Sequence, residues 1–405
     1  MKYVIRRANV ITMADESVLR GYDVLVADGK IAAVSRDIDA GACPEIQARG
    51  RYLLPGLFDM HVHLNTSDLI PLLFANGVTT VRNMWGFPQT LLWKRAIAAG
   101  KMVGPNIYTT GPLTDGETFW QGSERVMTAR EAEASVHRVV EAGYDYVKTL
   151  AAIPRDAFMR LMGAASAAGI RVVGHGNAQV SADELIALGY YSIEHAGCLP
   201  SRDEDVANLA ASGMWFCPTL VVTWTIRDFV HNDGDFRQLH AYEYVSELDR
   251  QAWDDITAKR KAHLRRPAPN LEDEVRRARI FAAQSDNLLL GTDTPNPGVI
   301  AGFSVHDELS LMVTDLGLTP YAALRAGTVN AARSLGILDR TGTLEPGKDA
   351  DLLMLRGNPL EDVRRTRDLD AVVKAGRLYD RAELDAILDG VRGLPVGDIL
   401  QVWRP

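Results

Sequence analysis

Along the chain, short apolar runs alternate with longer stretches whose apolar residues recur at helical spacing. The short runs cover residues 57–64, 78–83, 106–111, 144–149, 171–175, 192–195, 215–220 and 288–293. Helical spacing is clearest at 129–142, 154–168 and 181–188, where Thr128 and Ser181 are suitable N-caps. Because eight strands alternating with helices can close a parallel sheet, this pattern predicts an α/β fold, a (β/α)8 TIM barrel.

Both ends of the chain have a different pattern, with short strand-like runs separated by turn residues. At the N-terminal end these runs cover residues 3–12, 23–27, 31–35 and 47–54, and Asp28-Gly29 is a hairpin signal. At the C-terminal end, runs at 350–355 and 371–375 follow helical stretches at 305–316 and 320–335. We therefore expect residues 1–56 and 339–405 to form a composite β-sandwich domain beside a barrel of residues 57–338.

One connection of the predicted barrel is much longer than the others. It covers residues 223–285, is charged, and favours helix. Connections in compact domains are rarely so long unless they serve a function, and this one would emerge on the catalytic side of the barrel. We expect it to be a lid over the mouth.

Composition and charge narrow the class of protein. The 405 residues are 47% hydrophobic, and no run of apolar residues is long enough for a membrane span. A net charge of −8 without a basic run disfavours nucleic acid and anionic membranes as partners. The three cysteines have no paired spacing, and the first residues lack the apolar block of a signal peptide. We expect a cytoplasmic protein with a small-molecule substrate, and leave open whether it forms a homo-oligomer.

The first barrel run contains two imidazoles, in Asp59-Met60-His61-Val62-His63. Alternate residues of a strand point to the same face, so the two rings could share one divalent cation, although two hydrogen-bonded core histidines are the alternative. Four later runs also end in polar residues that would be costly to bury alone. These residues are Lys148, His175, His195 and Asp293. The C-terminal ends of the strands meet at the mouth of a barrel, so we favour one shared metal site over four unrelated polar residues.

These features together resemble the amidohydrolase superfamily, and within it the imidazolonepropionase-like and Xaa-Pro-dipeptidase-like branch. The resemblance covers nearly the whole chain. It rests on Pro55-Gly56-Leu57-Phe58-Asp59-Met60-His61-Val62-His63, Ile193-Glu194-His195, Gly291-Thr292-Asp293, residues 322–328 and residues 342–353. It implies a (β/α)8 barrel beside a composite β-sandwich, with divalent metal at the strand ends.

The resemblance also implies a role for each ligand. His61, His63 and Asp293 would bind the more buried ion, and His175 and His195 the more exposed one. Lys148 would be carboxylated by CO2, because two dications would repel an ammonium group, whereas a carbamate would bridge them. Two divalent ions are expected, with zinc as the first choice and manganese, cobalt and iron as alternatives.

A binuclear site of this kind implies hydrolysis of an amide or peptide-like carbon–nitrogen bond by a metal-bridging hydroxide, with Asp293 as general base and then general acid. Lactone or phosphotriester hydrolysis could use the same metal core. A non-catalytic superfamily member is disfavoured because no ligand is missing. Deamination is disfavoured because the usual His-x-x-Glu after strand five reads His175-Gly176-Asn177-Ala178 here.

The substrate is not identified by the sequence. Dipeptidase-like relatives tend to carry a Gly-Gly-His after strand three and a Tyr after strand seven, and residues 110–116 and 218–224 lack both. The residues that usually hold a free amino-acid carboxylate in such relatives are therefore missing, and imidazolone ring opening is disfavoured by the strand-four lysine. From position alone, the candidates for substrate binding are Arg82, Trp85, Trp120, Trp224 and Arg227, each with packing or surface exposure as the alternative.

Overall fold

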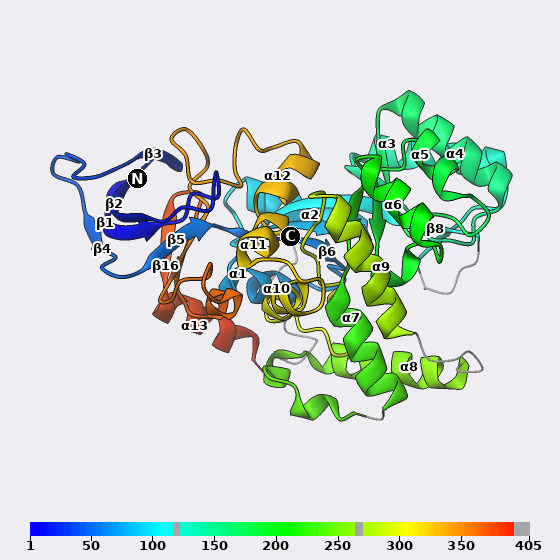
Figure 1. The fold of residues 1–405 in the computed structure, drawn as a ribbon. Helices are drawn as coiled ribbons and strands as arrows, with labels where there is room; N and C mark the ends of the chain where they lie inside the picture. Colours follow the sequence, from blue (N-terminus) through cyan, green and yellow to red (C-terminus); the bar gives the residue numbers. More distant parts are fainter. Residues whose placement is uncertain (117–121, 233, 264–269, 393–405) are drawn as a thin grey trace.

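The computed structural model of the chain describes residues 1–116, 122–232, 234–263 and 270–392. A β-sheet built from both ends of the chain lies at one end of the molecule, and a parallel barrel surrounded by helices lies beside it (Figure 1). This arrangement confirms the predicted fold class.

The barrel contains seven parallel strands that pair with one another in chain order. Most of their residues are buried, as expected for a parallel sheet covered by helices. A two-residue strand, β9 (Glu124–Arg125), adds to β8. The seven strands are β6 (Leu57–Val62), β7 (Val78–Asn83), β8 (Asn106–Asp115), β10 (Tyr146–Thr149), β11 (Arg171–Gly174), β12 (Ser192–Glu194) and β13 (Trp215–Cys217).

The predicted eighth strand, residues 288–293, is not a regular strand. It nevertheless closes the barrel, because the N–H of Leu289 donates to β13 and the carbonyl of Leu290 accepts from β6, each at 2.8 Å. Leu288 forms an isolated parallel bridge to β13, and Thr294, just after the segment, forms one to β6. Regular pairing stops because Gly291 packs too closely against β6 and β13 to carry a Cβ, and because Asp293 has a φ of 65°.

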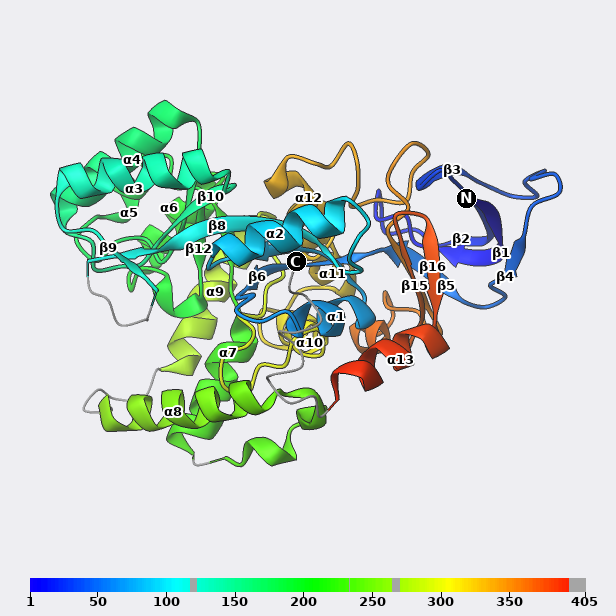
Figure 2. The ribbon, with the colours of Figure 1, turned by 180° about the vertical axis from the view of Figure 1, so that it is seen from behind.

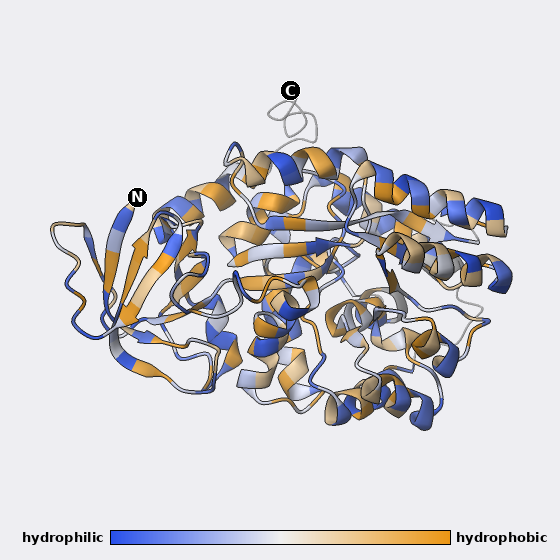
Figure 3. Cartoon of the chain, turned by 90° about the horizontal axis from the view of Figure 1, so that it is seen from above, coloured by the Kyte–Doolittle hydropathy of each residue, from blue (hydrophilic) through white to orange (hydrophobic). Residues whose placement is uncertain are grey.

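Helices cover the outside of the barrel and carry a hydrophobic and a hydrophilic side (Figure 3). Thr128 and Ser181 cap α3 and α5 through capping boxes, as predicted. The predicted helix at 320–335 is divided in two, because Thr328 leaves the helical region. The outer helices are α1 (Leu69–Ala75), α2 (Pro88–Ala98), α3 (Ala129–Ala142), α4 (Arg155–Ala168), α5 (Ala182–Ala187), α6 (Asp203–Ala211), α10 (Ser304–Thr314), α11 (Pro320–Ala326) and α12 (Val329–Leu335), with short 3-10 turns at η1 (Ala196–Cys198) and η5 (Val363–Arg367).

Both ends of the chain contribute to one mixed sheet, in the order β16-β15-β14-β5-β1-β2-β3, with β4 beside β1. The predicted turn at Asp28-Gly29 joins β2 to β3, with both residues at positive φ. β5 pairs with β14, which joins the two ends, and α13 (Arg381–Val391) packs on α1 (Figure 2). The strands are β1 (Lys2–Val10), β2 (Leu19–Ala27), β3 (Lys30–Ser35), β4 (Glu45–Gln47), β5 (Tyr52–Pro55), β14 (Leu352–Leu355), β15 (Leu369–Lys374) and β16 (Arg377–Asp380).

The long connection after β13 folds into helices, and residues 220–284 are called the helical insertion below. The seventh strand is shorter than predicted, because Thr219 is left-handed and Leu220 begins a helix. Trp253 is buried in a small core of the insertion, and its indole N–H donates to the carbonyl of Pro295 at 2.7 Å. The insertion contains α7 (Leu220–Thr225), the π-helix η2 (Ile226–His231), the 3-10 turns η3 (Phe236–Gln238) and η4 (Tyr242–Tyr244), α8 (Glu247–His263) and α9 (Leu271–Gln284).

Within the described ranges, no helix is both long enough and apolar enough to cross a membrane.

Candidate metal centre

The fold brings all six predicted ligands to one place at the mouth of the barrel. The four imidazole rings form a continuous chain, with ring centroids 5.3 Å apart between His63 and His61, 4.6 Å between His61 and His195, and 4.8 Å between His195 and His175. His61 is fully buried. The other predicted ligands line a common cavity: His63, Lys148, His175, His195 and Asp293.

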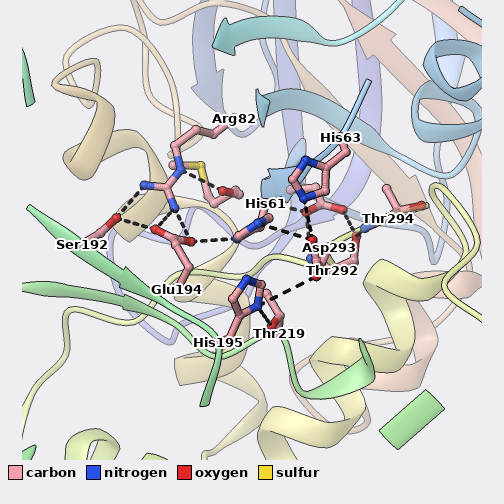
Figure 4. Close-up of polar contacts among 12 residues, drawn as sticks. His61, His63, Arg82, Ser192, Glu194, His195, Thr219, Thr292, Asp293 and Thr294 are labelled. Atoms are coloured by element: carbon pink, nitrogen blue, oxygen red, sulfur yellow. Dashed lines mark hydrogen bonds and ion pairs between the residues drawn. The ribbon is translucent and has the colours of Figure 1, made fainter. Parts of the chain in front are cut away.

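The Asp293 carboxylate lies among three of these rings (Figure 4). Its Oδ1 is 2.7 Å from Nε2 of His63 and 3.4 Å from Nε2 of His61, and its Oδ2 is 3.9 Å from Nδ1 of His195. Both Asp293 and His195 have positive φ angles, 65° and 72°, which are uncommon for residues other than glycine. Such backbone strain is typical of functional sites, where the surrounding fold holds a side chain in a required direction.

His61 is fixed from behind by a buried carboxylate. Its Nδ1 is 2.9 Å from Oε2 of Glu194, and the Arg82 guanidinium donates to both oxygens of Glu194, at 2.7 and 2.8 Å. Arg82 also donates to the carbonyl of Met60, and Ser192 contacts Glu194 (Figure 4). A carboxylate on one ring nitrogen leaves the other nitrogen, Nε2, facing the centre, as in metal-binding histidines.

Two further contacts hold the site. Nδ1 of His195 lies 2.7 Å from the hydroxyl of Thr219, at the strained start of α7. Asp59, which is fully buried on β6, accepts hydrogen bonds from the N–H of Thr292 at 3.0 Å and from its hydroxyl at 2.7 Å. Burial raises the pKa of Asp59 to about 7, although these hydrogen bonds oppose the shift. The residue preceding Asp293 is thereby attached to the strand that carries His61.

The protonation states suit metal binding. Burial lowers the pKa of His61 and His175 well below the usual value and lowers that of His195 to about 4, so these rings are neutral near pH 7. Burial acts against ionisation of Asp293, but its interactions with the His195 and His63 side chains outweigh burial and lower its pKa. Burial also lowers the pKa of Lys148, against the opposing charges of Glu194 and Asp293.

Four buried atoms at the centre have no hydrogen-bond partner of acceptable geometry: His61 Nε2, His63 Nδ1, Lys148 Nζ and Asp293 Oδ1. Buried polar atoms are costly without partners, so this cluster is incomplete as a purely protein structure. The possible ligand atoms of His61, His195 and Asp293 all lie within 4.8 Å of one another. Imidazole nitrogens and a carboxylate are suitable ligands for a divalent transition metal, so the residues present fit such an ion.

The substrate-binding candidates are placed differently. Trp85 lines the cavity, with its ring 6.0 Å from that of His63. Arg82 is buried behind the site, where Glu194 engages it. Trp224 and Arg227 stack on each other outside the described cavity lining, and the Trp224 indole donates to Asp315 at 2.8 Å. Trp120 lies outside the described residues.

The cavity has a volume of about 350 Å³, within the range of small-molecule sites. The barrel contributes most of its floor, and the helical insertion contributes several of the other lining residues. Among the described residues, those from the insertion are Val222, Thr223, Ile226, Asp249, Ala252, Ile256 and Glu274. Those from the barrel include Leu113 on β8 and, from its connections, Asn65, Leu150, Gly197, Pro295 and Asn296.

Sequence reasoning did not assign roles to the residues that support the ligands. Glu194 precedes His195, and Asp59 precedes His61 by two positions; both are charged residues in otherwise apolar runs, which was a usable signal. Thr219 gave no signal, because its role depends on the left-handed backbone after β13.

The chain matches the Amidohydrolase family over residues 52–379. It is 26% identical to the ochratoxinase of Aspergillus niger, over 93% of this chain and 87% of that protein. It is 30% identical over 226 residues to an adenine deaminase of Deinococcus radiodurans, covering 52% of this chain but only 41% of the deaminase. The chain thus aligns with less than half the length of that relative.

Solved structures share the fold. The bottromycin amidohydrolase has a TM-score of 0.77 at 28% identity, with 97% of this chain and 91% of that chain covered. An Xaa-Pro dipeptidase with bound methionine has a TM-score of 0.75 at 22% identity, with 94% of this chain and all of that chain covered. These findings support the predicted class of enzyme, a metal-dependent hydrolase of carbon–nitrogen bonds. With a family match that extends over most of its length, the chain belongs to the amidohydrolase family.

Proposed function

We propose that this chain is a binuclear metal-dependent hydrolase that cleaves an amide or peptide-like carbon–nitrogen bond in a small, largely apolar molecule. The observation that carries the proposal is the set of buried, unpartnered nitrogen and oxygen atoms around Asp293. Neutral imidazoles and an ionised carboxylate offer lone pairs there, and the adjoining cavity leaves room for a substrate.

In this proposal, His61, His63 and Asp293 hold one ion, and His175 and His195 hold the other. Two divalent ions, with zinc as the first choice, would supply Lewis acidity and lower the pKa of a coordinated water. Lys148 would help to hold both ions as a carbamate, which forms when its neutral amine bonds to the carbon of CO2 and releases a proton. The buried position of Lys148 and its lowered pKa support this step, because only the neutral amine reacts.

The remaining steps use side chains of this chain. A carboxylate oxygen of Asp293 takes the proton of the attacking water and delivers it to the leaving nitrogen, because an amide anion is a very poor leaving group. Glu194 and Thr219 hold the rings of His61 and His195 in orientation. The helical insertion limits solvent access, since several of its side chains line the cavity.

The test begins with chelated protein that is reloaded with zinc, manganese or cobalt in the presence of bicarbonate. Elemental analysis should give about two ions per chain. Carbon-13 bicarbonate should give a carbamate NMR signal that is lost in Lys148→Ala and retained in the control Lys101→Ala, which changes an exposed lysine.

Activity is then measured on amides, lactones, phosphotriesters and aminopurines in parallel. Turnover of amides supports the proposal. Turnover confined to lactones or phosphotriesters would reassign the reaction on the same metal core, and turnover confined to aminopurines would make the chain a deaminase. A loaded protein holding a single ion would refute the binuclear site.

A further inference from the structure

The substrate cavity carries acidic groups that the proposed reaction does not use. Asp249 on α8 and Glu274 on α9 both line it, on the helical insertion. A Cβ at Gly197 would lie 3.2 Å from the Glu274 carboxylate, which places this acid just beyond His195. Among the described lining residues, Lys148 is the only lysine or arginine, and it belongs to the metal centre. Apart from the candidate metal centre, the described lining therefore carries apolar, neutral polar and acidic side chains and no lysine or arginine.

Asp249 is the more deeply buried of these two acids. It is 4% exposed although it lines the cavity, and its Oδ2 accepts a hydrogen bond from the hydroxyl of Ser246 at 2.9 Å. Burial raises its pKa to about 7, and the negative charge of Asp68 adds to the shift. The Asp68 carboxyl group is therefore near enough for its charge to act on Asp249.

Asp68 comes from a different part of the fold, the loop between β6 and α1. It is also 4% exposed, and its Oδ2 is buried without any hydrogen-bond partner. It is the residue before α1, yet its side chain makes no capping hydrogen bond, so helix capping does not explain it. Within the described residues, no lysine, arginine or histidine forms an ion pair with Asp68 or Asp249.

Two buried carboxyl groups in proximity are unfavourable unless a proton or another cation compensates for their charge. Among the described residues, no basic side chain forms an ion pair with either carboxyl group. Asp249, however, faces the cavity. A protonated amine of a bound molecule would supply both the positive charge and the missing hydrogen-bond donors. The opposite charge, a substrate carboxylate, would be repelled from the same place.

We infer that Asp249, supported by Asp68, is a specificity site for a cationic amine on the substrate, so that this enzyme hydrolyses amides that also carry a free amine, such as amino-acyl compounds, rather than N-acyl amino acids with a free carboxylate. The inference rests on the proposed amide hydrolysis and adds the chemical class of substrate. It also agrees with the absence from the sequence of the dipeptidase-like residues that hold a carboxylate.

The first test measures binding and does not depend on turnover. Calorimetry at about pH 8, with the metal-loaded full chain, compares hexylammonium with hexanol, which has the same apolar chain and no charge. The wild type should bind hexylammonium more tightly, and Asp249→Asn should lose roughly 10- to 100-fold in that affinity while hexanol changes little. Asp255→Asn, an exposed acid on the same helix, is the matched control and should behave as wild type.

The second test measures kcat/KM for three anilides that share an alkyl chain and end in an amine, a hydroxyl or a carboxylate. The amine substrate should be preferred, and Asp249→Asn should abolish that preference, whereas the control Asp255→Asn should retain it. Asp68→Asn should reduce the preference less, and it provides a second variant if Asp249→Asn does not fold or retain metal.

Equal losses for the amine and hydroxyl substrates would make Asp249 a purely structural residue, and a preference for the carboxylate substrate would overturn the inference. If no anilide is hydrolysed although hexylammonium binding depends on Asp249, the amide reaction fails and the cation site stands. If anilides are hydrolysed without regard to charge, the reaction stands and the cation site fails.

Discussion

The buried pair of Arg82 and Glu194 can be tested by changing Arg82 to methionine, which keeps much of the length of the side chain and removes its charge. Sequence reasoning proposed Arg82 as a substrate-binding residue, whereas the structure places it behind His61. The two roles predict different outcomes. A substrate contact should affect KM, and a structural ion pair should affect folding and metal retention.

The magnitude follows from the geometry. The side chains of Arg82 and Glu194 are 1% and 0% exposed, and the guanidinium makes two hydrogen bonds to the carboxylate at 2.7 and 2.8 Å. Removing one member of a buried pair leaves an uncompensated charge and costs about 3–5 kcal/mol. That is a large share of the roughly 5–15 kcal/mol by which a folded domain is stable. Adding Glu194→Gln removes the stranded charge, so the double variant should recover part of the loss.

The assay is denaturant unfolding of the four members of this cycle, together with chelator competition for the bound metal. Glu194→Gln alone should weaken the ion held by His61 by roughly 10- to 100-fold, since the carboxylate on Nδ1 is lost. Arg227→Met is the control, because Arg227 pairs with Asp228 in a partly exposed position, and the substitution should cost under about 1 kcal/mol. The reasoning is refuted if Arg82→Met is no more destabilising than Arg227→Met and raises KM instead.

Four further outcomes are expected. Lys148→Ala and Lys148→Arg should both lose most turnover and at least one ion. A short carboxylic acid should partly restore the alanine variant. Full activity of Lys148→Arg with two bound ions would contradict the carbamate. Trp253→Phe should lower kcat/KM and cost about 0.5–1.5 kcal/mol, because it removes the hydrogen bond to Pro295; wild-type kinetics would mean that this link does not affect the site. Burial lowers the pKa of His306 to about 3, so its contribution to stability is complete above about pH 6.5 and is lost as the pH falls towards 3. His306→Gln should therefore reduce the loss of unfolding free energy between pH 7.5 and 5.5 by about 1.4 kcal/mol, and parallel pH profiles would disprove this. Chelation should lower the melting temperature, because metal binds the folded state, and an unchanged melting temperature would argue against tight ions.

The fold could be predicted wherever a local pattern determined the structure. The strand at residues 78–83 and the helix at residues 129–142 have the predicted bounds, since burial periodicity and a capping box act within a few residues. The eighth barrel segment could not be assigned correctly, because Gly291 and Asp293 break regular pairing through close packing and backbone strain.

The same distinction applies to the site. That the six candidate ligands lie close together could be predicted from the sequence, because parallel strands end at one edge of a barrel and strand-end position therefore determines proximity. The contact of Arg82 with Glu194 could not be predicted from the sequence, because the two residues are more than a hundred positions apart and only the closed barrel brings them together. Asp249 was not singled out either, since its burial depends on how the helical insertion folds over the cavity.

The pairing of β5 with β14 has a consequence for synthesis on the ribosome. Leu53 and Leu54 of β5 pair with Met354 and Leu353 of β14, about 300 residues later in the chain. At roughly 5–20 residues per second, β5 waits about 15–60 s before its partner has been made. During this interval the emerging chain exposes an apolar strand edge that can pair with other chains. The sheet is therefore completed late, only after nearly the whole chain has been made. Chaperone depletion should reduce the yield of soluble full-length chain, because the exposed edge of β5 pairs with other chains before β14 is available.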